Sequence, residues 1–329
     1  MKKLTFLIIF SLAGTMMFSA CKKQDPEPEE ETPKTVVQSD QSGSAAIDGA
    51  LDDVNDIINN KIGNGSNANN QRIGNYNLPC GVISLDSTTN SSGNQEYKIR
   101  YGDQTPCGYR KRSGEIKFQL TNGTAYNQEG AIFTINFIDY TVEVKATGDI
   151  VVVNGTLSVT NKDGGYIWET ITDSKTIVHK VRGSLTVKYV NGQVRERKIF
   201  QLRTWASSNS WAGLTFTVSG DTLIDSKNIS ETGKTYEGNY PYKTEIITDL
   251  QWSNCGTTYA GPYKLKTGNG RMHIDALNIS PAYIDVEAGY FVNPQNLTST
   301  PSKVNNCESN AYKISIVLGE LTHIQHQLY

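Results

Sequence analysis

Residues 133–144 read FTINFIDYTVEV, and this stretch indicates what kind of fold the chain adopts. Apolar residues take alternate positions, first at odd and then at even numbers: Phe133, Ile135 and Phe137, then Ile138, Tyr140, Val142 and Val144. Alternation is the pattern of a strand with one buried and one wet face. Since successive side chains point to opposite faces, the change of phase predicts a bulge or bend within one long strand.

The rest of the chain carries further strand and turn signals. Three other stretches alternate in the same way: 97–101, 115–120 and 184–189. Asn-Gly pairs, the strongest short hairpin signal, occur at Asn122-Gly123, Asn154-Gly155 and Asn191-Gly192. Hairpins at such intervals exclude a parallel βαβ fold. We therefore predict an all-β fold, a large and mostly antiparallel meander or sandwich over 78–329, with a second small β unit from about 240 as an alternative.

Four alternating stretches are preceded by a glycine, and we expect these glycines to begin strands. They are Gly114, Gly155, Gly183 and Gly270. Their unequal spacing does not fit a solenoid of fixed period. It fits hairpins of varied length.

Residues 44–63 form the one good helix candidate. Apolar residues recur there in steps of three and four: Ile47, Leu51, Val54, Ile58 and Ile62. The acidic residues of this segment lie mostly off that face: Asp48, Asp52, Asp53 and Asp56. The helix either packs on the β body as a lid or plug, which is the usual role of an amphipathic stripe, or binds a partner.

The N-terminus has the layout of an export signal. Lys2 and Lys3 precede an apolar run too short to span a bilayer, and Ser19-Ala20-Cys21 follows it. We predict a signal peptide over 1–20 and lipidation of Cys21, with palmitate among the acyl chains; an ordinary cleaved signal with a chance cysteine is the alternative. Residues 21–43 are charged and polar, so we expect a lipidated, disordered tether. The protein would then be lipid-anchored at the outer membrane, surface-exposed or facing the periplasm.

Four cysteines remain beside Cys21. An even number in an exported chain suggests two disulfides. We favour Cys80–Cys107 and Cys255–Cys307, because each pair closes a short excursion within one half of the chain; two other connectivities are open. None forms a Cys-x-x-Cys unit, which argues against a zinc or redox site.

The amino-acid composition limits the classes of partner that the protein could bind. Removal of residues 1–20 takes away Lys2 and Lys3, which leaves 29 basic against 33 acidic residues and a net charge of −4. This mild charge offers no basic surplus for nucleic acid. The expected partners are a membrane, through the N-terminal lipid, and a glycan or an envelope protein.

The sequence contains no recognisable catalytic constellation. The chain lacks a Gly-x-Ser-x-Gly elbow and has only four histidines, so we predict no enzyme activity, no cofactor and no metal site. His273 with Asp275 on one strand face, and His323 with His326, lack a third ligand. Carboxylates suited to a glycosidase are present, but no spacing singles out a pair: Asp139, Glu143, Asp149, Glu169 and Asp173.

Aromatic residues leave one binding hypothesis. Trp205 and Trp211 flank a polar, turn-like segment and could form an exposed platform for stacking sugars. The alternative is that these rings, with Trp168 and Trp252, fill the β core.

Several stretches together resemble a group of uncharacterised β-rich lipoproteins of Bacteroidetes. The resemblance covers most of 45–200 and is carried by LDDV (51–54), CGVISLD (80–86), RKRSGEI (110–116), FTINFIDYTV (133–142) and VNGTLSVTN (153–161). It implies a β-rich lipoprotein and no established activity. Charged runs after the lipid cysteine accompany export to the outer face in such bacteria. Their exported proteins can also carry O-glycans at Asp-Ser/Thr motifs, which here would be Ser87 and Thr222.

The sequence therefore predicts a lipid-anchored envelope protein that acts as a non-enzymatic surface binding or structural module. Three alternatives stay open: a glycan-binding lipoprotein of an uptake system, a fimbria-like subunit that polymerises by strand addition, and a hydrolase.

Overall fold

The structure is a computed structural model. It describes residues 33–62, 78–89, 94–102, 110–144, 148–190, 192–234, 241–254, 265–276, 282–293, 300–304, 308–309, 311–318 and 320–328. The predicted signal peptide, Cys21, Cys107, Cys255 and Cys307 lie outside these residues.

Most of the described residues belong to strands. The helical elements are α1 (Pro33–Ile57), the π-helical turn η1 (Ile58–Ile62), α2 (Glu169–Thr172) and the 3-10 turn η2 (Trp211–Gly213). The strands of the first half are β1 (Val82–Thr89), β2 (Gln95–Tyr101), β3 (Arg110–Asn122), β4 (Ala131–Val144), β5 (Asp149–Asn161), β6 (Ile177–Tyr189) and β7 (Val194–Ala206). Those of the second half are β8 (Thr215–Gly220), β9 (Thr222–Ile224), β10 (Lys227–Lys234), β11 (Pro241–Asn254), β12 (Leu265–Ala276), β13 (Ala282–Phe291), β14 (Ser302–Lys303), β15 (Ala311–Leu318) and β16 (Leu321–Leu328).

These strands form one antiparallel sheet, which confirms the predicted all-β meander. Its order follows the sequence from β1 to β7 and then runs β10-β11-β12-β13-β15-β16. Between β7 and β11, β10 pairs with both neighbours at one end and β8 pairs with both at the other. β10 and β11, on either side of position 240, are paired with each other.

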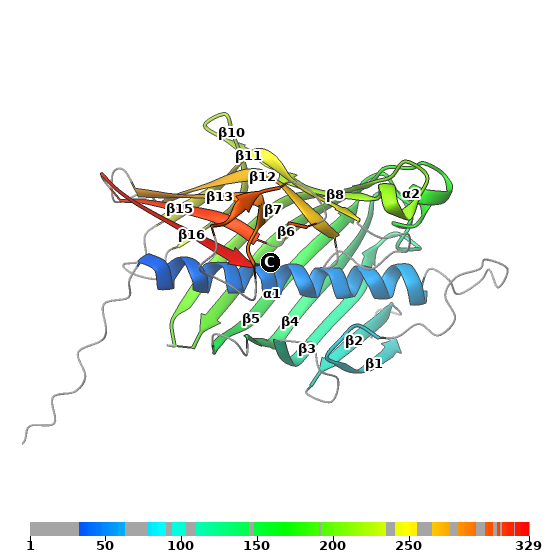
Figure 1. Ribbon diagram of the computed structural model, residues 1–329. Coiled ribbons are helices and arrows are strands. Elements are labelled where there is room, and N and C mark those ends of the chain that lie inside the picture. The colour runs from blue at the N-terminus through cyan, green and yellow to red at the C-terminus, as the bar shows by residue number, and fades with distance from the viewer. Residues whose placement is uncertain are drawn as a thin grey trace, which may run out of the picture.

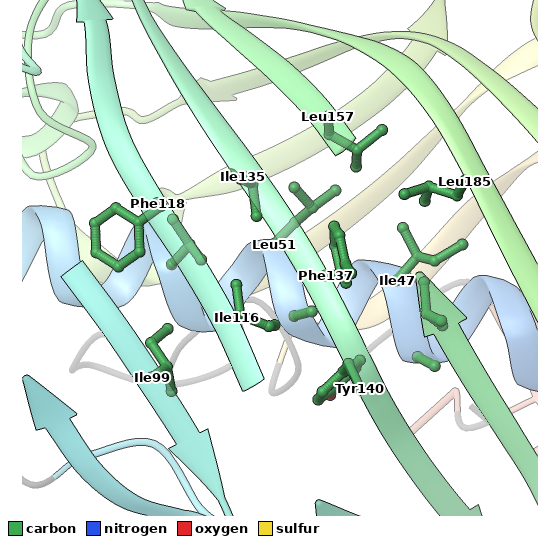
Figure 2. Packing of buried hydrophobic residues seen from close by; sticks show 14 of the residues in the cluster. Ile47, Leu51, Ile99, Ile116, Phe118, Ile135, Phe137, Tyr140, Leu157 and Leu185 are labelled. Atoms are coloured by element: carbon green, nitrogen blue, oxygen red, sulfur yellow. The ribbon is translucent and has the colours of Figure 1, made fainter. Parts of the chain in front are cut away.

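Helix α1 covers one face of this sheet. Figure 1 shows the helix lying across β3 to β7. Its apolar stripe is buried against the strands and includes Ile47, Leu51, Val54, Ile57 and Ile58. In Figure 2, Ile47 and Leu51 lie among Ile116, Ile135, Phe137, Leu157 and Leu185, which come from β3, β4, β5 and β6. The helix therefore packs as a lid on its own sheet, and the interpretation of its apolar face as a partner-binding surface is wrong.

The helix is longer than predicted. It begins at Pro33, within the segment expected to be a disordered tether, and passes through η1 to Ile62. Pro33 takes the first helical position, where proline's missing N–H costs no hydrogen bond and its fixed φ suits the helix. The polar sequence before residue 44 shows no apolar period, so pattern alone could not reveal this first part.

The change of phase in β4 is a bulge, as predicted. The register with β5 shifts between Phe137 and Tyr140, and both of these residues are buried. Asp139 has a φ of 46° at this point. Asn154 of β5 holds the bulge, because its Oδ1 accepts a hydrogen bond from the Asp139 N–H at 2.8 Å.

The glycines expected to begin strands lie inside them instead. Gly114, Gly155, Gly183 and Gly270 all have positive φ within β3, β5, β6 and β12. A Cβ on each would approach the backbone of the neighbouring strand. Consequently Asn154-Gly155 is not a hairpin turn, whereas Gly123 and Gly192 do lie between paired strands. Mid-strand glycines and bulges bend a sheet, and those of β3 to β6 lie in the part that wraps α1.

We expect Gly114→Ala to destabilise the protein by at least about 2 kcal/mol more than Gly130→Ala in urea unfolding. Both glycines have positive φ, of 88° and 75°, so both substitutions strain the backbone. Only at Gly114 would the new Cβ overlap the carbonyl of Asp139, whereas nothing lies within 4 Å of one at Gly130. Equal losses for the two variants would show that the close approach of β3 to the bulge is unimportant.

Candidate functional site

The most developed polar site of the described structure is the interface between α1 and the sheet. Acidic side chains flank the apolar stripe of the helix on both sides and meet arginines that point inward from the strands. Asp52 and Asp53 are only 7% and 2% exposed. The sequence placed these carboxylates off the apolar face, where they do lie, but it did not indicate that Asp52 and Asp53 are buried.

The first contact joins α1 to β2 and β3 through Asp53. Its Oδ2 accepts hydrogen bonds from Arg112 Nη1 at 2.7 Å and from the Tyr101 hydroxyl at 2.8 Å. Arg112 also donates to the carbonyl of Cys80 at 3.0 Å, and its guanidinium lies over the Tyr101 ring. One helix turn earlier, Gly49 makes room for the guanidinium: a Cβ there would lie 3.1 Å from Arg112 Nη2.

The second contact joins α1 to β7. Arg203, 2% exposed, forms ion pairs with Asp48 and, at 3.9 Å, with Asp52. Asp48 and Asp52 are four residues apart and therefore share one flank of the helix. Arg203 is also held by Gln201 Oε1, which accepts hydrogen bonds from its Nε at 3.2 Å and from its Nη2 at 3.1 Å.

The third contact extends the interface to β10 and β11. Arg197 Nη2 donates to Ser44 Oγ on α1 at 2.8 Å. The same guanidinium binds Glu231 of β10 in a bidentate pair, with both bonds at 2.6 Å. Tyr242 of β11 donates its hydroxyl proton to Glu231 as well. Bidentate Arg–carboxylate pairs fix geometry as well as charge, so this group orients four elements together: α1, β7, β10 and β11.

The end of the helix has its own attachment. The Asn59 amide oxygen, on η1, accepts a hydrogen bond from the backbone N–H of Ile167 at 2.6 Å, and its amide nitrogen donates to the carbonyl of Asn55 at 2.6 Å. Ile167 belongs to the connection between β5 and β6. These contacts thus fix the helix from Ser44 to Asn59.

Burial changes the acid–base behaviour of these groups. Burial raises the pKa of Asp53 to about 6, although the positive charge of Arg112 acts to lower it. Burial also raises the pKa of Asp52, against the charge of Arg203. His179 of β6 lies beside the Trp205 ring, and burial together with Arg203 lowers its pKa to about 3. Near neutral pH, His179 is therefore uncharged.

Sequence reasoning did not find the arginines of this interface. A signal was available in β7, where Arg195, Arg197 and Arg203 occupy the alternate positions that carry buried Ile199 and Trp205. A charged residue in the buried phase of a strand indicates an ion partner inside the fold. The sequence does not indicate that partner, because the helix is distant in the chain: Arg197 and Ser44 are 153 residues apart.

The predicted tryptophan platform is wrong for Trp205. This residue is fully buried, with its ring 5.0 Å from that of Phe216 in a second hydrophobic cluster. Trp211, on η2, is half-buried and packs against the same cluster, as does Trp252. Trp168 stacks on Tyr166 with ring centroids 5.8 Å apart. The indole rings of Trp205 and Trp211 therefore do not form an exposed pair.

The other predicted sites lie apart from the helix interface. Cys80 is exposed and free, and its preferred partner Cys107 lies outside the described residues, so both disulfides remain predictions. Ser87 is exposed on β1, while Thr222 on β9 is half-buried and accepts a hydrogen bond from Arg182 at 3.3 Å. His273 lies on β12 with its ring nitrogen 2.9 Å from Asp285 of β13.

Two further features of the described residues concern metal binding and the membrane. No three of their His, Cys, Asp or Glu side chains are grouped so as to hold a metal ion. None of their helices has both the length and the apolar character needed to cross a membrane.

Comparison with known proteins gives no relative: no protein family, curated protein or solved structure matches the chain. The site must therefore be interpreted from its own geometry. Its groups are paired acids and bases that hold α1 on the sheet, and this arrangement serves attachment.

Removing one partner of the buried pair should be costly. We expect Asp53→Ala to lower the free energy of unfolding by about 3–5 kcal/mol, because Arg112 would keep a buried and poorly compensated charge. The matched control is Asp86→Ala at the exposed pair with Arg100, for which we expect at most about 1 kcal/mol. Urea unfolding of both variants measures the difference, and similar small losses would contradict the role given to Asp53.

We expect His179 to contribute to the loss of folding stability at acidic pH. Its folded-state pKa of about 3 lies below the ordinary value of 6.5, so its contribution to stability is present above 6.5 and is lost as pH falls toward 3. Asp53 affects the pH dependence of stability in the opposite direction. Its raised pKa stabilises the folded state at pH values below its ordinary pKa, and this contribution is lost as pH rises through about 6. We expect His179→Leu to flatten the decline in unfolding free energy between pH 6.5 and 4, by up to about 1.4 kcal/mol per pH unit. Parallel pH profiles for the variant and the parent would count against this assignment.

Proposed function

We propose that this chain is a lipid-anchored protein of the bacterial outer membrane that acts as a non-enzymatic binding or structural module. The observation that carries the proposal is the attachment of α1. The helix begins only 12 residues after Cys21, the expected lipid site, and it is clamped to β3, β7 and, through Arg197 and Glu231, β10. A force applied at the lipid anchor would therefore be transmitted through α1 to the sheet.

The short separation has a geometric consequence. Twelve residues can span at most about 40 Å even when fully extended. The start of α1 would thus remain within that distance of the membrane surface. A body held this close suits contact with the envelope or with a ligand presented at the surface.

The non-enzymatic part of the proposal rests on the sequence, in which no nucleophile and base are set out in a recognised order. A glycan-binding role within an uptake system is the second candidate. The observation that favours it is a polar pocket on β12, β13 and β15, which is considered below. A fimbria-like subunit and a hydrolase remain open, and neither gains support from a specific contact of the described residues.

Anchoring can be tested by replacing single cysteines in the full chain expressed in a lipoprotein-processing bacterium. We expect Cys21→Ser to abolish incorporation of labelled palmitate and to move the protein from the detergent phase to the aqueous phase, because diacylation is what makes membrane binding stable. Cys80→Ser is the matched control and should retain both properties. Membrane association and labelling that survive Cys21→Ser would overturn the proposal.

A further inference from the structure

The outer strands of the second half carry a small polar pocket. It has a volume of about 230 Å³ and is lined by Arg271, Asp285, Glu287, Lys313 and Ser315. Pockets for drug-sized ligands usually measure about 300–1,000 Å³. This pocket therefore suits one small group, and its polar lining suits a ligand that is polar on every side.

Strand register explains why these side chains meet. Arg271 of β12 is opposite Glu287 of β13, which in turn is opposite Lys313 of β15. The next row on the same face places Asp285 between His273 and Ser315. The intervening positions face the other side, where Val286 and Ile314 are buried. The pocket is thus built on three paired strands.

The two carboxylates of the pocket already have cationic partners. Asp285 accepts a hydrogen bond from Arg271 Nη2 at 2.6 Å and lies 2.9 Å from His273 Nδ1. Glu287 accepts one from the Tyr290 hydroxyl at 3.0 Å and pairs with Lys303. These contacts with Lys303 and Tyr290 keep the pKa of Glu287 below its ordinary value, despite desolvation.

Lys313 is the cation of the pocket that has no direct partner. Within the described part of the chain its ammonium group takes part in no hydrogen bond or ion pair; it lies 5.9 Å from the centre of the Tyr290 ring, and its charge helps to lower the pKa of Glu287. The Ser315 hydroxyl beside it is likewise without a partner among those residues. The pocket thus offers an ammonium group and a hydroxyl that have no direct hydrogen-bond partner among the described residues, next to carboxylates that can still accept hydrogen bonds.

We propose that this pocket binds one acidic sugar residue of the uronate type. Its carboxylate would pair with Lys313, because an ammonium group forms a charge-assisted hydrogen bond with an oxyanion. Its ring hydroxyls would donate to Asp285 and Glu287 and accept from Ser315 and Arg271. A plain anion would leave the acceptors of the pocket unused, and a neutral sugar would leave Lys313 unpaired. The inference names a ligand class for the proposed binding module and so rests on that proposal.

The test is a titration of the purified full-length chain with sodium glucuronate, followed by calorimetry or by NMR chemical shifts. Glucose and acetate are the ligand controls, because glucose has the ring hydroxyls without the carboxylate and acetate has the carboxylate without the ring. We expect glucuronate to bind and Lys313→Met to weaken it at least tenfold, which corresponds to one charge-assisted hydrogen bond. Lys117→Met, which removes a similarly half-buried lysine of β3, should leave binding unchanged.

Three outcomes would overturn the inference: no glucuronate binding, glucuronate binding unaffected by Lys313→Met, or binding of a ligand control, glucose or acetate, as tight as that of glucuronate. Thermal melting of each variant checks that it is folded, and Ser315→Ala gives a second, smaller perturbation that should also weaken glucuronate. Because binding in solution does not depend on the lipid, failure here leaves the anchoring result standing, and failure of anchoring leaves this result standing.

Discussion

The buried pair of Asp53 and Arg112 is the contact on which the packing of α1 depends most. A charge taken out of water is costly unless it meets an opposite charge and further hydrogen bonds. Asp53 has both, from Arg112 and from Tyr101, and Arg112 is held in turn by the Cys80 carbonyl. The apolar stripe supplies most of the favourable burial. The ion pairs on its flanks specify one position and one rotation of the helix on the sheet.

The sheet is shaped to accept the helix. A long antiparallel sheet twists and needs local irregularities to curve around an element on one face. Here the bulge at Asp139 lies next to Gly114, and Gly155 and Gly183 approach the backbone of each other's strands. These irregularities lie in the strands that α1 crosses (Figure 1).

Part of this arrangement could be read from the sequence. Alternation predicted the antiparallel sheet, the steps of three and four predicted the inner face of α1, and the phase change in 133–144 predicted the bulge. The four glycines were noticed but taken for strand starts, since sequence does not show which backbone approaches them. The inward arginines of β7 were missed because alternation scoring treats charge as exposed. Their partners are distant in sequence, and only the fold brings them together.

The central claim is that α1 is an integral part of the fold and opens only when the sheet unfolds. Native-state hydrogen exchange measures this directly, by comparing the opening free energies of α1 amides at 46–57 with those of β3 to β6. We predict that the two sets reach the same value, equal to the global free energy of unfolding. Helix amides that open at a much lower free energy than the strands would contradict the account, because α1 would then be a detachable cover.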